Sequence, residues 1–232
     1  DWDEACTKEI NPRVQYHFCN ESLRDSFYSG SWEYQNCEKH SIFMSQAATP
    51  IKGLHFMLRA MPEILKNYPD AHLYVAGNDL TKTDSLYGKL KISSFAKYIK
   101  RLISEYSLEE KVTFTGTLTE QKMKERFLKS NVFVSPSTIE NSPNSLGEAM
   151  LLGVPCISSD VGGVKNMLVH NLEGYIYQVD APYMIAYYVK KIFDDADCAL
   201  IISKNAKSHA VKTHNRDENL KTLLKIYRDL YE

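Results

Sequence analysis

Two glutamates, Glu140 and Glu148, bracket seven small or polar residues, Asn-Ser-Pro-Asn-Ser-Leu-Gly. A carboxylate accepts hydrogen bonds from two hydroxyl groups at once, and a hydrogen bond to a charged group is worth about 1.5–3 kcal/mol. The sequence predicts that a helix begins near Ser145, and the N–H groups of a first helical turn form an anion site. The stretch therefore predicts an anion-binding helix end with a carboxylate on either side of it.

Each glutamate also has an ordinary interpretation. Ser145-x-x-Glu148 fits a capping box, in which the serine and the glutamate satisfy each other's backbone donors. Glu140 by itself is typical of a solvated loop acid. With 29 acidic residues in the chain, two glutamates at this spacing are a weak signal on their own.

Other metal and phosphate motifs are missing or badly placed. The sequence has no GxGxxG, GxxxxGK[ST] or HExxH pattern. Of its two Asp-x-Asp triplets, residues 1–3 lie at the start of the given chain and residues 195–197 lie between helices, where acids cap helix ends. We therefore predict no metal, and we expect His170 and His214 to be surface residues rather than catalysts.

The elements that must position these residues alternate along the chain. Short runs rich in Val, Ile, Phe and Tyr and closed by turn residues predict six buried strands. They are residues 41–47, 72–77, 111–116, 131–136, 155–160 and 174–179. Helical patterns lie between them, over residues 54–65, 86–106, 119–130 and 146–152. This alternation predicts an α/β fold, a doubly wound Rossmann-like parallel sheet with helices on both faces, whose ligands bind beyond the strands' carboxyl ends.

The two ends of the chain differ from this pattern. Residues 1–40 are aromatic, polar and irregular, with one helix expected near residues 21–28, and we interpret them as a connecting segment ahead of a single domain of residues 41–232. The last 50 residues form a helical tail. An apolar stripe at the helical period is expected to pack on its own domain, although it could also reach another part of a longer protein. Its members are Leu220, Leu223, Leu224, Tyr227, Leu230 and Tyr231.

Composition excludes several classes of protein. The chain has 232 residues, 44% hydrophobic and 25% charged, which is typical of a soluble globular protein. Its 28 basic and 29 acidic residues give no overall electrostatic case for binding nucleic acid or an anionic membrane. Five scattered cysteines with no CxxC favour a reduced, cytoplasmic setting, and no apolar run approaches the ~20 residues that span a bilayer.

Three stretches, residues 49–79, 111–118 and 132–177, carry a family resemblance. Together they resemble the C-terminal, nucleotide-sugar-binding domain of the family 4 retaining glycosyltransferases, which have the two-domain B-type fold. The motifs are specific in combination: Lys-Gly opening the first helix, Gly-x-Leu after the third strand, Glu-x7-Glu, Gly-x-Pro and Asp-x-Gly-Gly. The resemblance runs from about residue 41 to 195, and "DWDEAC" and "NESLRDSFY" also resemble the linker into this domain in bacterial members.

The resemblance implies a role for each charged residue. Glu140 would contact the donor hexose and Glu148 the ribose hydroxyls, so that the two acids hold opposite ends of one nucleotide sugar. Lys52 would be the counter-charge that stabilises the departing diphosphate. No metal or other cofactor is then needed, because fixed protein charge takes the metal's place.

The resemblance also implies roles for the backbone. The amides of Asn144, Ser145 and Leu146 would hold the diphosphate on the helix dipole. Gly53 would allow close backbone approach, and Gly162 and Gly163 would shape a loop beside the site rather than touch the ligand. The turn that receives the base through main-chain atoms would be Gly116, Thr117 and Leu118.

The sequence departs from the family pattern in two places. The family carries an arginine about five residues before the lysine, where this chain has Gln46 and Ala47. Either Lys52 bears more of the phosphate charge, or another group such as Lys82 or Arg101 supplies it. The residue after Glu140 is an asparagine, which leaves the sugar preference open.

The resemblance further implies an N-terminal acceptor-binding domain, for which residues 1–40 are too short. We therefore expect an excised C-terminal half whose partners are a nucleotide sugar and the missing domain, and which transfers no sugar by itself. Two alternatives remain: a nucleotide-sugar epimerase on the same architecture, which would want further acids in the cleft, and a non-catalytic nucleotide-sugar-binding module. Base, hexose, acceptor and membrane association cannot be read from the sequence.

Overall fold

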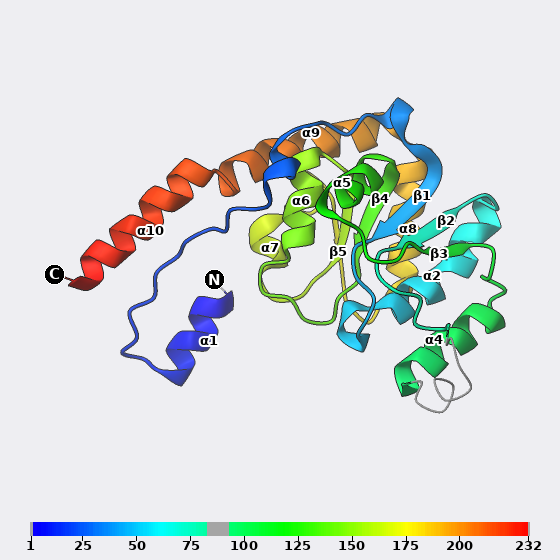
Figure 1. The fold of residues 1–232 in the computed structure, drawn as a ribbon, viewed down its shortest axis with the longest axis horizontal. Helices are drawn as coiled ribbons and strands as arrows, with labels where there is room; N and C mark the ends of the chain where they lie inside the picture. The colour runs from blue at the N-terminus through cyan, green and yellow to red at the C-terminus, as the bar shows by residue number, and fades with distance from the viewer. Residues whose placement is uncertain (1, 83–92, 232) are drawn as a thin grey trace.

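The computed structural model describes residues 2–82 and 93–231, and its centre is a six-stranded parallel sheet with the order β3-β2-β1-β4-β5-β6 (Figure 1). The strands are β1 (Glu38–Met44), β2 (His72–Val75), β3 (Val112–Phe114), β4 (Ser130–Ser135), β5 (Cys156–Ser159) and β6 (Tyr175–Tyr177). Each predicted apolar run overlaps one of them, although β3, expected to be buried, has no fully buried residue. The α/β, doubly wound Rossmann-like fold predicted from the alternation is confirmed.

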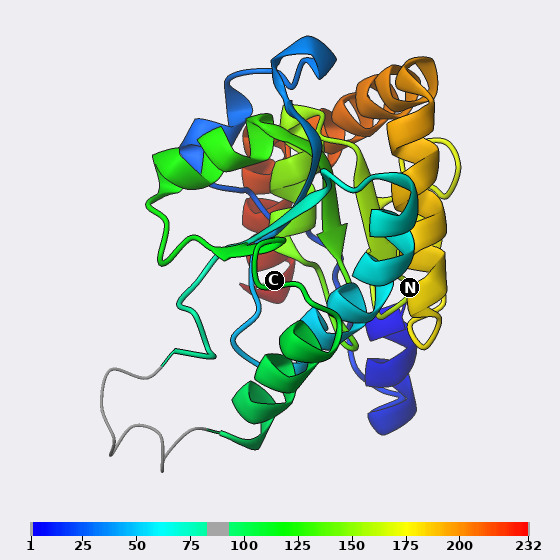
Figure 2. The same cartoon turned by 90° about the vertical axis from the view of Figure 1, so that its right-hand side faces the viewer.

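Helices cover both faces of the sheet (Figures 1 and 2). One group is α2 (Leu54–Asn67), α4 (Ser94–Glu105) and α8 (Pro182–Asp194); the other is α5 (Glu120–Leu128), α6 (Asn144–Leu152) and α9 (Ala196–Thr213). In α2 the stripe residues Leu54, Leu58 and Met61 are buried, and the helix ends at Asn67, just before the Tyr-Pro-Asp sequence that predicts its end. The helix predicted over 86–106 is α4, although residues 86–92 lie outside the described part of the chain.

The segment before β1 belongs to the same core as the sheet. Leu23, Phe27 and Trp32 are buried, and the Phe27 ring meets Phe127 edge-on at 5.9 Å. The Trp32 indole N–H donates to the carbonyl of Ser130 at 2.7 Å. The expected boundary between the connecting segment and the domain, at residues 40 and 41, falls inside β1, so packing continues across it.

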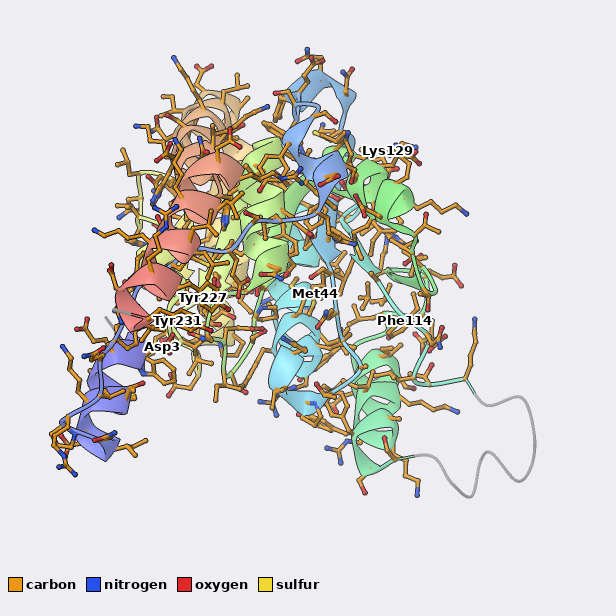
Figure 3. All side chains as sticks on the ribbon, turned by 60° about the vertical axis from the view of Figure 1, so that its left-hand side comes forward. Asp3, Met44, Phe114, Lys129, Tyr227 and Tyr231 are labelled. Carbon is orange, nitrogen blue, oxygen red and sulfur yellow. The ribbon has the colours of Figure 1, made fainter. Side chains whose placement is uncertain are left out.

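Both chain ends depart from the expectations. A helix, α1 (Trp2–Ile10), occupies the supposedly irregular start, and the helix expected near 21–28 is a single 3₁₀ turn, Asp25–Tyr28. The tail helix α10 (Arg216–Tyr231) is present, but the expectation that its apolar stripe packs on its own domain is wrong. Its six members are 41–90% exposed, because α10 extends beyond the sheet with Tyr227 and Tyr231 towards its far end (Figure 3).

Parallel strands bring their carboxyl ends to one edge of the sheet. Met44 and Phe114, the last residues of β1 and β3, lie at this edge, and Lys129, which precedes β4, lies at the other (Figure 3). The chain leaves β1 towards β2 and leaves β4 towards β5, so the strand order reverses between these two neighbours. Ligands of open α/β sheets bind at such a reversal, and the loops that follow β1 and β4 carry Lys52 and Glu140.

Candidate active site

A cavity of about 570 Å³ lies where the loops after β1 and β4 meet the N-terminal segment. Its charged and helix-start lining consists of Arg24, Lys52, Glu140, Asn144, Ser145 and Glu148. A second hollow of about 630 Å³ shares Gln46 and Lys52 with it and continues over Gly77, Thr117 and Leu118. The two hollows form one trough with a charged half and a more apolar half.

Lys52 and Glu140 meet in the charged half. The Lys52 Nζ lies 2.6 Å from Glu140 Oε1, and the two side chains are 25% and 13% exposed. The backbones of their loops are also joined, since the Thr138 N–H donates to the Ile51 carbonyl at 2.8 Å. Residues 88 positions apart are thus brought together as the predicted site requires.

Glycines set the spacing of these loops. Gly53 has a positive φ of 75°, and a Cβ on it would lie 1.8 Å from the Pro136 carbonyl oxygen. Its close backbone approach is therefore to the end of β4. A Cβ on Gly162, where φ is 50°, would lie 1.6 Å from the Glu140 carbonyl oxygen. The Gly163 N–H donates to the Asn141 carbonyl at 3.0 Å. The Asp-x-Gly-Gly turn accordingly shapes the loop that carries Glu140.

The start of α6 differs from the predicted capping box. The helix begins at Asn144 with Pro143 as its N-cap, and no side chain caps it, so the capping-box expectation is wrong. Leu146, expected to offer its amide to a diphosphate, donates it to Pro143 at 2.9 Å and has a fully buried side chain. In the described chain no acceptor lies within hydrogen-bonding distance of the N–H groups of Asn144 and Ser145, which both line the cavity. These two donors remain at the positive end of the helix dipole.

Glu148 is bound to an arginine that the sequence interpretation missed. Arg24 donates from Nε to Oε1 at 2.6 Å and from Nη2 to Oε2 at 2.7 Å, while Glu148 is only 3% exposed. This bidentate bond raises the pKa of the Arg24 guanidinium. The signal available was the "NESLRDSFY" stretch itself, which carries the arginine. Neither Lys82, which pairs with Asp79 at 3.5 Å, nor Arg101, whose guanidinium lies 5.2 Å from the Tyr98 ring, lines the cavity.

The turn predicted to receive the base is only partly open. Gly116 and Gly77 exchange both backbone hydrogen bonds, at 3.0 and 3.1 Å, which ties the ends of β2 and β3 together. The amide of Gly116 is thereby occupied. Thr117 and Leu118 line the more apolar half of the trough.

Histidines and acids elsewhere have structural contacts. Asp195 caps α9 by accepting from the Cys198 N–H at 2.8 Å, and His170 accepts from Ile176. His214 is not the surface residue expected: it is 3% exposed, its Nδ1 lies 2.8 Å from the Glu21 carbonyl, and burial lowers its pKa. Among residues 2–82 and 93–231 no three His, Cys, Asp or Glu side chains gather as a metal site would require. In the same residues no helix combines the length and apolar character needed to cross a membrane.

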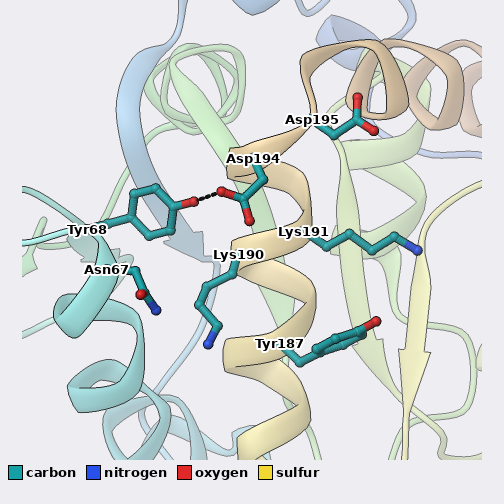
Figure 4. A pocket seen from close by; sticks show the side chains of 7 residues that line it. All are labelled: Asn67, Tyr68, Tyr187, Lys190, Lys191, Asp194 and Asp195. Atoms are coloured by element: carbon teal, nitrogen blue, oxygen red, sulfur yellow. Dashed lines mark hydrogen bonds between the residues drawn. The ribbon is translucent and has the colours of Figure 1, made fainter.

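Another hollow, of about 510 Å³, lies between the ends of α2 and α8 (Figure 4). Two of its charged groups have partners within the fold, because the Tyr68 hydroxyl donates to Asp194 and Lys190 lies 3.2 Å from Glu63. Burial, together with the Asp194 contact, raises the pKa of Tyr68 to about 12. The hollow is therefore a gap in the packing of α2 against α8, and it lies at the edge of the sheet opposite Lys52.

Comparison with known proteins decides the family. Residues 34–209 match the sequence profile described as glycosyl transferases group 1. The chain belongs to this family. An uncharacterized glycosyltransferase of Methanocaldococcus jannaschii is 27% identical over 194 residues, which are 84% of this chain and 46% of that protein. A second glycosyltransferase of that organism is 32% identical over 155 residues, 65% of this chain and 34% of the relative.

Solved structures of glycosyltransferases share the fold. The sucrose-phosphate synthase of Thermosynechococcus elongatus superposes with a TM-score of 0.79 at 21% identity, over 99% of this chain and 56% of that one. The Anabaena protein HepE in complex with UDP-glucose gives a TM-score of 0.67 at 19% identity, over 84% of this chain and 49% of its own. The group 1 domain described here spans about half the length of the curated relatives it matches.

Proposed function

We propose that this chain is the donor-binding part of a retaining hexosyltransferase that uses a nucleotide-diphosphate sugar. The observation that carries the proposal is the contact of Lys52 with Glu140 in the same cavity as Glu148 and the start of α6. Membership of the group 1 glycosyl transferases supports it. The acidic, basic and helix-end groups are those that a sugar, a diphosphate and a ribose would each require.

The trough suggests how the donor would lie. The base would occupy the more apolar half beside Thr117 and Leu118, and the ribose hydroxyls would donate to Glu148. The diphosphate would receive hydrogen bonds from the N–H groups of Asn144 and Ser145. The hexose would then reach Glu140, whose carboxylate orients its hydroxyls.

Lys52 has the central part in the proposed reaction. Breaking the bond between the sugar's anomeric carbon and the diphosphate leaves the electron pair on a phosphate oxygen, where negative charge develops. The Lys52 ammonium would stabilise this charge, together with the dipole of α6, and a preorganised cation is worth most where charge develops. Its pair with Glu140 is open enough to be exchanged for a phosphate.

The acceptor is proposed to bind elsewhere. Because the chain spans about half the length of its relatives, we propose that an acceptor-binding domain of a longer protein completes the cleft. The chain by itself is expected to bind donor weakly and to transfer no sugar. Sugar transfer by this polypeptide alone would contradict that part of the proposal.

Calorimetric titration with UDP, GDP and ADP, and with their sugars, tests donor binding. We expect one nucleotide to bind, and Lys52→Met to weaken binding of the diphosphate about 10- to 100-fold, the value of one charge-assisted hydrogen bond. Lys190→Met is the matched control, because Lys190 is equally exposed, at 25%, and is also paired with a glutamate, but lies at the opposite edge of the sheet. No heat from any nucleotide would overturn the proposed function, and equal losses in both variants would remove Lys52 from the site.

A further inference from the structure

The segment of residues 20–28, here called the N-terminal strap, is firmly held against the cavity. Contacts on both sides of Arg24 attach it to helices far along the chain. They are the Glu21 carbonyl with His214 at 2.8 Å, the Leu23 carbonyl with Arg216 at 3.0 Å, the Ser26 N–H with Glu120 at 3.0 Å, and the buried Phe27 ring with Phe127. The strap is therefore a fixed wall of the cavity.

Arg24 joins a buried charge to the open cavity. The side chain of Glu148 is 4% exposed, whereas that of Arg24 is 42% exposed, so the guanidinium reaches from the buried carboxylate into solvent. A buried carboxylate that loses its cation is strongly destabilised. The bidentate bond thus fixes where Glu148 points.

The guanidinium retains donors for a ligand. It carries five N–H groups, and two of its three nitrogens, Nε and Nη2, are used on Glu148. The third nitrogen, Nη1, has no acceptor in the described chain. Of the described residues that line the cavity, Arg24 and Lys52 are the basic ones.

The charges that line the cavity favour a second cation for the diphosphate. Lys52 pairs with Glu140 and Arg24 pairs with Glu148, so these two cations are the charges that can contact a diphosphate from the lining of the cavity. Lys52 is a flexible point charge, but a guanidinium is a rigid fork that matches phosphate geometry and can serve two acceptors at once. Each Glu148 oxygen keeps a second lone pair, so it can accept a ribose hydroxyl while still bound to Arg24.

We propose that Arg24 is the second phosphate-binding cation of the donor site, and that the same side chain positions Glu148 for the ribose. The inference rests on the proposed function, since it names a further residue of the same site. It assigns the N-terminal strap to the binding site. The strap then couples the nucleotide to α5, to α10 and to the turn between α9 and α10, whose residues hold it in place.

The test compares a ligand that has a diphosphate with one that lacks it. UDP is titrated directly and uridine is measured by displacement of UDP, for wild type, Arg24→Gln and Arg24→Lys. A residue that only positions Glu148 changes both affinities by the same factor, because both ligands contain the ribose. A phosphate-binding arginine lowers the ratio of UDP to uridine affinity, by about 10-fold or more in Arg24→Gln, with partial recovery in Arg24→Lys.

Controls keep the outcomes distinct. Arg216→Lys loosens the strap at the Leu23 carbonyl and leaves the guanidinium on Glu148, so its affinity ratio is expected to equal that of wild type. If Arg24→Gln fails to fold, the ratio of UDP to uridine affinity in Arg24→Lys decides the test, because that variant retains the charge opposite Glu148. An unchanged ratio would overturn the proposal for Arg24 while donor binding stands. If GDP or ADP is the nucleotide bound, the comparison uses it and its nucleoside; if none binds wild type, the proposed function itself fails.

Discussion

Two acid–base pairs in one cavity differ in how deeply each is buried. Lys52 and Glu140 are 25% and 13% exposed, so the Glu140 carboxylate is more accessible to water than that of Glu148. Glu148 is almost inaccessible, and removing its arginine would leave a buried charge unpaired. The first pair can therefore open for a ligand, while the second is expected to persist through binding.

Gly53 provides a prediction on single-residue packing. Gly53→Ala must place a Cβ 1.8 Å from the Pro136 carbonyl oxygen at φ 75°, so it carries both strain and a clash with backbone. We expect it to lower the free energy of unfolding by more than about 2 kcal/mol, measured by urea denaturation. Gly116→Ala is the control, because φ is 73° there but no atom lies within 4 Å of the new Cβ, and it should cost about 1–2 kcal/mol. Equal losses in the two variants would show that the contact with Pro136 can relax.

The elements divide into those that local pattern predicts and those that it does not. All six strands and the helix after Pro143 follow from short apolar runs and turn residues, because a parallel sheet buried on both faces requires them. The nearness of Lys52 to Glu140 also follows, since both succeed neighbouring strands, but their direct ion pair was not predicted. Arg24 could not be placed in this way, because 124 residues separate it from Glu148 and no repeat or period relates a strap to a helix. The capping-box interpretation of Ser145 and Glu148 fails because Arg24 holds the glutamate, a contact that local pattern does not reveal.

The junction of the strap with α9 and α10 is expected to respond to pH. Burial lowers the pKa of His214 below that of a free histidine, so the folded state resists protonation and the unfolded state binds the proton more tightly. This contribution to stability is complete above the unfolded pKa near 6.5 and is lost as the pH falls below it.

Urea denaturation of wild type and His214→Gln at pH 7, 6 and 5 measures this effect. We expect the variant to be less stable at pH 7 but to lose less stability than wild type on acidification. The difference between the two slopes is at most about 1.4 kcal/mol per pH unit, the limit for one proton. His17→Gln, on the exposed part of the N-terminal segment, is the control and should retain the wild-type slope. Burial also lowers the pKa of His55, His72 and His170, so the wild-type slope exceeds that of one group. If the free energy of unfolding falls with pH equally in wild type and His214→Gln, the junction is not a source of the pH dependence.

At the scale of the whole molecule, a compact sheet domain carries two helices that contribute little to its core. No residue of α1 is buried, and Asn219 is the buried residue of α10. The 3.6-residue period of the tail correctly predicted a helix with one apolar face. It could not predict what covers that face, because periodicity states the direction of a stripe and nothing about its partner.

The position of α10 predicts that its outer part is dispensable for folding. Ending the chain at Thr222 removes most of the exposed stripe but keeps Arg216 and Asn219, whose side chains donate to the strap carbonyls of Leu23 and Glu21. We expect the free energy of unfolding to stay within about 0.5 kcal/mol of the full chain, as for surface changes generally. Ending the chain at Asn215 removes both donors and should lower stability and, if the strap lines the donor site, nucleotide affinity as well. A large loss on ending the chain at Thr222 would mean that the stripe is covered in solution, and sedimentation of the full chain would then reveal a second copy as the cover.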